Sequence, residues 1–151
     1  MKVYADTSVF GGVFDEEFLQ PSKEFFNEVE SGRFLLVTSA VVQAEISSAP
    51  KKVQDFFFSM TANAEVAELT QEVLELRQAY LDANIVTPKS KDDATHVALA
   101  SISDCDMIIS WNFKHIVHFE KIPKYNAVNT IKGYGHLDIF SPSQVIKYDD
   151  I

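Results

Sequence analysis

The stretch Met1–Val9, MKVYADTSV, places a carboxylate directly behind a short apolar run. Lys2–Ala5 has the composition of a β-strand, Asp6-Thr7-Ser8 follows it, and Gly11-Gly12 comes shortly after. Strand interiors disfavour aspartate, so Asp6 marks the end of a strand that we expect to be central in a sheet. Open parallel sheets bind ligands outside the carboxyl ends of their strands. We therefore expect Asp6 to have a functional role.

Strand and helix signals alternate along the rest of the chain, which predicts one α/β domain over residues 1–151 with a mainly parallel sheet. Further strands are predicted at Phe34–Val37, Cys105–Ile109 and Leu137–Phe140, while Ala64–Glu68 is ambiguous. Helices are predicted at Ser22–Ser31, Ala40–Ser47, Lys51–Met60, Leu69–Asn84, Asp92–Ile102 and Pro123–Gly133. Their expected N-caps include Ser22, Thr38 or Ser39, and Ser90.

The composition is that of a soluble globular domain with a net charge of −9. A chain of 151 residues buries about 70% of its unfolded surface, and 46% hydrophobic residues exclude disordered and collagen-like classes. The longest uncharged stretch, Phe34–Ala44, is far shorter than the roughly 20 residues that span a bilayer. Asp6 interrupts the apolar region that a signal peptide needs, and the lone Cys105 excludes an intramolecular disulfide. We expect a cytoplasmic protein with no membrane partner.

Other acidic or polar residues fall where further strands end or helices begin. Glu45 lies on the helix after the second strand, Asp93 lies in the first turn of the helix after Ser90, and Asn112 follows the strand that ends near Ser110. Mg²⁺ and Mn²⁺ prefer oxygen ligands, and a bound divalent ion activates water for attack on a phosphoryl group. Three such carboxylates suit metal-assisted hydrolysis of a phosphodiester.

Four stretches in order along the chain resemble the successive motifs of PIN domains, a family that includes the VapC toxins of bacterial toxin–antitoxin pairs. They are Met1–Val9 (MKVYADTSV), Thr38–Ile46 (TSAVVQAEI), Asp93–Ala100 (DATHVALA) and Met107–Ile116 (MIISWNFKHI). The segment Gly133–Ile146 also resembles the end of one PIN subgroup.

The resemblance implies a PIN-like three-layer α/β/α fold and a ribonuclease that depends on Mg²⁺ or Mn²⁺. Asp6, Glu45 and Asp93 match the acidic residues of the family, and Thr7 or Ser8 matches the hydroxyl beside the first. Many members carry a further aspartate where this chain has Asn112, a neutral oxygen ligand. The implied partners are an RNA substrate, a cognate antitoxin and a second copy of the chain, with apolar contacts such as Phe25 or Phe56–Phe58.

The candidates other than Asp6 also have a purely structural interpretation. Asp93 follows Ser90 at the spacing of a capping box, in which the carboxylate accepts a bond from the backbone N–H of the cap. Asp92 has the character of a solvated first-turn acid, and Glu45 alone would be an exposed helix residue. Asn112 either supports the metal ligands from behind by hydrogen bonds or forms a turn, since asparagine is common in turns.

Three further side chains are candidates for supporting the site or contacting substrate. His96 lies one turn beyond Asp93 and is either structural or part of the site. Trp111 stacks on an RNA base or packs its own loop, and Ser110 precedes it. Lysine side chains near these motifs are candidates for phosphate contact: Lys89, Lys91, Lys114 and Lys124.

Two other functions compete with the ribonuclease. Aspartyl phosphatases also use an aspartate after the first strand, but they need a second acid two residues later, where this chain has Ser8. A degenerate PIN module would bind RNA or a protein without cleavage; Asn112 favours it, and the triad Asp6, Glu45 and Asp93 argues against it.

Overall fold

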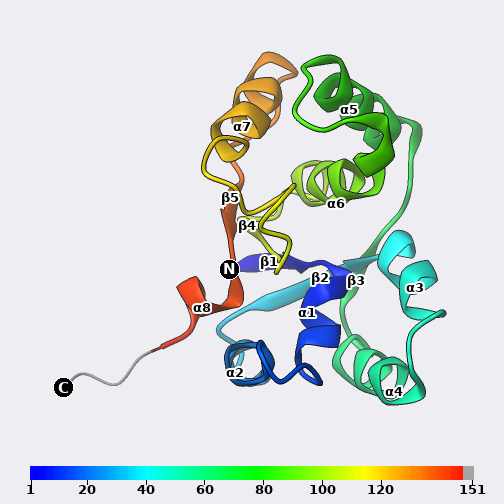
Figure 1. The fold of residues 1–151 in the computed structure, drawn as a ribbon, viewed down its shortest axis with the longest axis vertical. Coiled ribbons are helices and arrows are strands. Elements are labelled where there is room, and N and C mark those ends of the chain that lie inside the picture. Colours follow the sequence, from blue (N-terminus) through cyan, green and yellow to red (C-terminus); the bar gives the residue numbers. More distant parts are fainter. Residues whose placement is uncertain (148–151) are drawn as a thin grey trace.

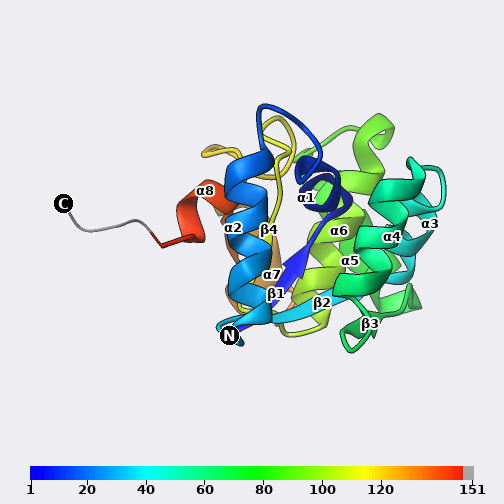
Figure 2. The same cartoon turned by 90° about the horizontal axis from the view of Figure 1, so that it is seen from below.

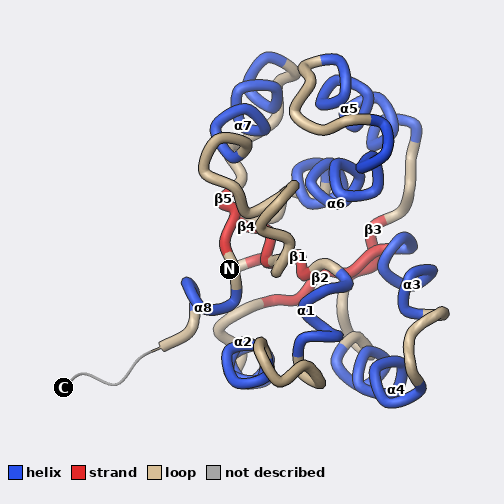
Figure 3. Tube along the Cα trace, in the orientation of Figure 1, coloured by secondary structure: helices blue, strands red, loops and turns tan. Residues whose placement is uncertain are grey.

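The computed structural model describes residues 1–147. Within them, five parallel strands form one sheet in the order β3-β2-β1-β4-β5 (Figure 3). The strands are β1 (Lys2–Ala5), β2 (Leu35–Ser39), β3 (Glu65–Ala67), β4 (Met107–Ile109) and β5 (Asp138–Phe140). The sequence predictions of a mainly parallel sheet and a central first strand are therefore confirmed.

Helices cover both faces of the sheet (Figures 1 and 2). They are α1 (Thr7–Gly12), α2 (Leu19–Glu30), α3 (Ala40–Ile46), α4 (Lys51–Met60), α5 (Gln71–Asp82), α6 (Lys91–Ile102), α7 (Ile122–Ile131) and α8 (Pro142–Val145), with a 3₁₀ turn η1 at Pro88–Ser90. Figure 1 shows α5, α6 and α7 on one face and α1 to α4 on the other, which is the predicted three-layer arrangement. No helix in residues 1–147 has the length and apolar character needed to cross a membrane.

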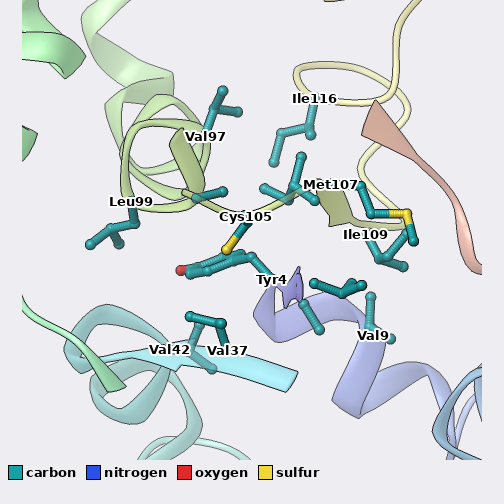
Figure 4. Close-up of a cluster of buried hydrophobic side chains, with 14 of the residues drawn as sticks. Tyr4, Val9, Val37, Val42, Val97, Leu99, Cys105, Met107, Ile109 and Ile116 are labelled. Carbon is teal, nitrogen blue, oxygen red and sulfur yellow. The ribbon is translucent and has the colours of Figure 1, made fainter. Parts of the chain in front are cut away.

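The central strand is buried on both faces, as parallel strands covered by helices must be. Tyr4 pairs with Val37 of β2 and Ile108 of β4, and it is fully buried. In Figure 4 its ring lies between Cys105 on one side and Val42 on the other. The Tyr4 ring therefore packs in the core, while its hydroxyl remains available for a buried polar contact.

Several element boundaries differ from the sequence predictions for local chemical reasons. The predicted helix from Leu69 begins two residues later, because the Thr70 hydroxyl accepts a hydrogen bond from the Val73 N–H and caps it there. The segment after Asp6 is helical although it contains Gly11 and Gly12, because the Asp6 side chain caps α1. The ambiguous segment at Ala64–Glu68 contains the edge strand β3.

Ser22 is not the helix cap that the sequence suggested. It lies inside α2, fully buried, and its hydroxyl oxygen accepts a hydrogen bond from Trp111 Nε1 at 2.9 Å. Gly12 lies against this bond, since a Cβ atom there would be 2.5 Å from Ser22 Oγ and 2.7 Å from Trp111 Nε1. A glycine is therefore required at position 12 by close packing.

We predict that Gly12→Ala destabilises the protein by about 1–3 kcal/mol, the usual cost of overpacking a dense interior. Gly11→Ala is the matched control in the same helix, because a Cβ atom there meets nothing within 4 Å. Alanine favours a helix over glycine by up to about 1 kcal/mol, so the control should be neutral or stabilising. Urea unfolding measures both, and equal effects of the two substitutions would contradict the packing argument.

Candidate functional site

Asp6 is held at the carboxyl end of β1 by hydroxyl groups from two elements. Its Oδ1 accepts hydrogen bonds from the Ser8 backbone N–H at 3.1 Å and the Ser8 hydroxyl at 2.5 Å, and its Oδ2 accepts one from the Ser110 hydroxyl at 2.6 Å. Ser8 Oγ in turn accepts the Trp111 N–H at 2.9 Å. The carboxylate thus ties the start of α1 to the loop that follows β4.

The Asp6 side chain is almost out of contact with water, with only 5% of the residue exposed. Burial raises the pKa of Asp6, because the charged carboxylate loses its hydration. The charge of His96 and the hydroxyls of Ser110 and Ser8 lower the pKa but only partly offset this effect. Asp6 therefore occupies a place where a nearby positive charge would stabilise its ionised form.

Glu45 approaches the same edge from α3, whose start is fixed by the Ser39 hydroxyl accepting the Val42 N–H at 3.1 Å. Glu45 Oε1 accepts a hydrogen bond from Thr7 Oγ1 at 3.0 Å and pairs with His96 Nε2 at 2.7 Å. Burial alone would raise the pKa of Glu45, but the hydrogen bonds and charge of His96 and Thr7 outweigh it and lower the pKa. Its side chain keeps 40% exposure, so the carboxylate still faces solvent.

His96 is the buried partner at the centre of these charges, with 3% of the residue exposed. Its Nδ1 lies 2.8 Å from the Tyr4 hydroxyl, and its Nε2 contacts Glu45. Burial would lower the pKa of His96, but the hydrogen bond to Glu45 and the charges of Asp6, Glu45 and Asp93 raise it. The imidazole therefore offsets part of the carboxylate charge from inside the protein.

Asp93 lies in the first turn of α6, whose amino end meets the carboxyl ends of the strands. Its carboxylate makes no hydrogen bond or ion pair with any other residue of the described part of the chain. Burial raises the pKa of Asp93, and the charges of His115 and His96 only partly offset this. The capping box expected with Ser90 does not form, because the Ser90 side chain makes no cap bond and its hydroxyl lies 3.2 Å from His115 Nε2.

The remaining candidates have contacts that explain their positions. The Asn112 side-chain oxygen accepts the backbone N–H groups of Lys114 at 3.2 Å and His115 at 2.9 Å, so it organises the turn after β4. The Trp111 ring is buried and stacks on Phe18 with ring centroids 4.2 Å apart. In this position it packs its own loop against the protein. Asp92 is exposed beside Asp93.

The donor chemistry at this edge fits a hard divalent cation, since Asp6, Glu45 and Asp93 supply carboxylate oxygens. Their charges are close enough for Glu45 to raise the pKa values of both Asp6 and Asp93. In residues 1–147, however, no three His, Cys, Asp or Glu side chains converge closely enough to hold a metal as they stand. Protein donors take up both oxygens of Asp6 and one oxygen of Glu45, so a cation would require side-chain adjustment at Asp6.

Sequence reasoning missed the polar residues behind the acids. The Tyr4 hydroxyl contacts His96 Nδ1 at 2.8 Å and is held in turn by a 2.8 Å contact with the Ser39 hydroxyl. Both Tyr4 and Ser39 are fully buried. The one available signal was a tyrosine in an otherwise apolar strand, because a buried tyrosine hydroxyl usually finds a hydrogen-bond partner.

The buried pair of His96 and Glu45 predicts how stability depends on pH in the metal-free protein. Because the folded state raises the pKa of His96, it binds the imidazole proton more tightly than the unfolded chain does. The stabilisation is therefore fully present below the ordinary imidazole pKa of about 6.5 and is lost as pH rises through the folded-state value. The raised pKa of Asp6 acts in the same direction, and the lowered pKa of Glu45 removes stability only on the acid side, around or below about pH 4.

We therefore expect the melting temperature in EDTA to fall between pH 6 and pH 9. The fall should be smaller in His96→Gln, which cannot be protonated. Calorimetric melting across this range measures the effect, and parallel pH profiles for the wild type and the variant would contradict the assignment.

Comparison with known proteins identifies the fold family. A crystal structure of VapBC2 from Rickettsia felis, solved with a DNA fragment from their promoter, superposes with a TM-score of 0.59 at 13% sequence identity, covering 93% of this chain and 98% of that chain. A search among curated proteins found no match. The sequence model of the PIN domain matches residues 2–114, a range that contains Asp6, Glu45, Asp93 and Asn112. PIN domains are generally nucleases, and the length of this match shows that the chain belongs to the PIN domain family.

Proposed function

We propose that this protein is a metal-dependent ribonuclease. The observation that carries the proposal is that Asp6, Glu45 and Asp93, from three separate segments at the carboxyl edge of the sheet, lie near enough for the charge of Glu45 to raise the pKa values of both aspartates. Membership of a family of nucleases supports hydrolysis of a phosphodiester. Buried acids whose pKa values are raised are typical of functional sites.

In the proposed reaction, Asp6, Glu45 and Asp93 hold one Mg²⁺ or Mn²⁺ ion. When bound, such an ion lowers the pKa of a coordinated water and neutralises charge that grows on the phosphoryl group. Ser8 and Ser110 hold the Asp6 carboxylate in place, and Thr7 holds Glu45. The residues of the chain thus orient the ligands before substrate arrives.

Single-stranded RNA is the proposed substrate. A chain with a net charge of −9 repels phosphates over most of its surface, so local positive charge near the site must favour binding. Lys89 and Lys91 lie beside the start of α6, and Lys114 lies in the loop after β4; all three are exposed. Lys124 is exposed near the start of α7.

We also propose a role as a VapC-type toxin with a cognate antitoxin. The VapBC2 relative supports this, because its name denotes a pair of proteins and its fold extends over nearly the whole of this chain. The test is co-expression with the product of the neighbouring reading frame, followed by purification through a tag on that product. Failure of this chain to co-purify would argue against the pairing.

We further propose a homodimer, with the contact on the exposed part of α4. Phe25 and Phe57 are buried and cannot take part, whereas Phe58 is 63% exposed and Phe14 is 38% exposed. Phe14 packs edge-on against Phe56 of α4 with ring centroids 5.9 Å apart, so it is a second partly exposed aromatic side chain next to α4. Light scattering at tens of micromolar should give the mass of a dimer for the wild type and of a monomer for Phe58→Asp. A monomeric wild type would contradict this proposal.

The alternative function is a degenerate PIN module that binds RNA or a protein without cleavage. The engagement of both Asp6 oxygens and of Glu45 Oε1 by protein donors is the observation that favours it. The two functions differ in their response to metal, because an ion that binds only the folded state stabilises it by about 2.7 kcal/mol at a hundred times its Kd.

We predict that Asp93→Asn loses metal-dependent RNA cleavage by more than about 100-fold, since even outer partners of a metal cost 10–100-fold when removed. The metal-free variant should melt at the wild-type temperature or above it, because the raised pKa of Asp93 means that its charge destabilises the folded state at neutral pH. Melting curves with EDTA and with Mn²⁺, beside a cleavage assay, measure these effects.

Wild-type protein should show a saturable rise in melting temperature with Mn²⁺, and Asp6→Asn should abolish that rise. A wild type that neither shifts at millimolar Mn²⁺ nor cuts RNA would favour the binding module. If Asp93→Asn has a lower melting temperature than the wild type in EDTA and still cuts RNA, Asp93 has a structural role and is not a metal ligand.

A further inference from the structure

The two oxygens of Glu45 have different surroundings. Oε1 receives both the Thr7 hydroxyl and His96 Nε2, at 3.0 and 2.7 Å. Oε2 makes no hydrogen bond with any residue of the described chain. The carboxylate is therefore anchored through one oxygen, and the other remains available to an external partner.

His96, which contacts Glu45, is held in turn by buried residues of the core. The Tyr4 hydroxyl lies 2.8 Å from His96 Nδ1 and 2.8 Å from Ser39 Oγ, and Ser39 Oγ accepts the Val42 N–H at 3.1 Å. When Nε2 carries the proton that points at Glu45, a neutral His96 accepts from Tyr4, and Tyr4 accepts from Ser39. Each group in this chain then has a donor or acceptor of the right kind.

This chain of contacts joins all the elements that carry the acids. Tyr4 lies on β1, two residues before Asp6. Ser39 caps the helix that bears Glu45, and His96 lies one turn beyond Asp93 on α6. The Tyr4 ring is packed among apolar side chains (Figure 4). A buried, well-packed ring limits the rotation of its hydroxyl and hence of the imidazole bonded to it.

We propose that His96 is a positioning residue that holds Glu45 through Oε1 so that Oε2 is presented as a ligand oxygen for the divalent ion. The inference rests on the proposed function, because it assigns His96 a role in that same site. Metal-ligating carboxylates are commonly held by such outer hydrogen bonds, whose loss costs 10–100-fold in metal affinity. Without His96, only the Thr7 hydroxyl holds Oε1, so the Glu45 side chain gains rotational freedom that metal binding must oppose.

His96→Gln and His96→Asn form a matched pair that separates position from charge. Both variants carry a neutral amide, but only glutamine is long enough to place an N–H donor near the position of Nε2. Asparagine places its amide nearer Nδ1, on the Tyr4 side. We expect the Mn²⁺ Kd of His96→Asn to be 10–100-fold weaker than that of His96→Gln, as measured by titration calorimetry.

Tyr4→Phe provides a second test, because it removes a hydroxyl that contacts His96 and does not contact Glu45. We expect it to weaken Mn²⁺ binding several-fold relative to wild type. It also replaces the matched pair if His96→Asn melts below the assay temperature in EDTA. Melting curves and circular dichroism in EDTA establish that each compared variant is folded.

A metal-free readout tests the anchor directly. Nitrogen chemical shifts of the imidazole in EDTA, at a pH where His96 is neutral, should show the proton on Nε2. Glu45→Ala should make that proton exchange faster with water. A proton on Nδ1 in the wild type would overturn the inference, because Nε2 could not then donate to Glu45.

The outcomes distinguish this inference from the proposed function. If the wild type binds Mn²⁺ and cuts RNA while the glutamine and asparagine variants bind Mn²⁺ equally, the positioning role is wrong and the ribonuclease stands. If the wild type binds no Mn²⁺, the proposed function is wrong and the role of His96 toward a metal is overturned with it. Weaker Mn²⁺ binding by His96→Asn than by His96→Gln supports both the positioning role of His96 and the metal site of the proposed ribonuclease.

Discussion

The structure depends on a carboxylate that is removed from water at the end of the central strand. An ionised acid in such a place must be paired or hydrogen-bonded, because the loss of hydration costs several kcal/mol otherwise. Asp6 meets this requirement with the hydroxyls of Ser8 and Ser110. Because these donors come from α1 and from the loop after β4, satisfying one charge also fixes the relative positions of the segments that build the site.

The second organising group is His96, which faces the acids from inside the α6 layer. Asp6 and Asp93 have raised pKa values and Glu45 a lowered one, a division that follows from which carboxylate contacts the imidazole. Direct contact with a cationic partner favours ionisation, while burial without it disfavours the charge. The metal-free site is therefore short of positive charge, and a divalent ion would supply it.

Much of the fold could be predicted from the sequence, because buried parallel strands appear as apolar runs and α3 has an N-cap serine in front of it. The acids at the strand ends were visible for the same reason, since Asp6 interrupts a pattern that otherwise predicts a core strand. The short helix α1 was missed because its two glycines are poor helix formers, while its capping by Asp6 depends on side-chain geometry.

Tertiary contacts decided what local patterns could not. Ser22 and Ser90 both have the sequence character of helix caps, yet their hydroxyls contact Trp111 and His115, which are distant in the chain. Asn112 had two open interpretations, and its bonds to the backbone of its own turn became visible only in the structure. Residue type and spacing predict on which element a side chain lies, whereas the packing of the folded chain decides which group it hydrogen-bonds.

The most direct test of a metal site at Asp6, Glu45 and Asp93 is anomalous diffraction at the manganese edge from crystals soaked with Mn²⁺. We expect a peak bounded by the carboxylates of Asp6, Glu45 and Asp93, with Glu45 coordinating through the oxygen that His96 does not contact. The same crystals of Asp6→Asn should lack the peak. The absence of a peak at this edge of the sheet in the wild type, at Mn²⁺ concentrations that support RNA cleavage, would show that these three acids do not hold the ion.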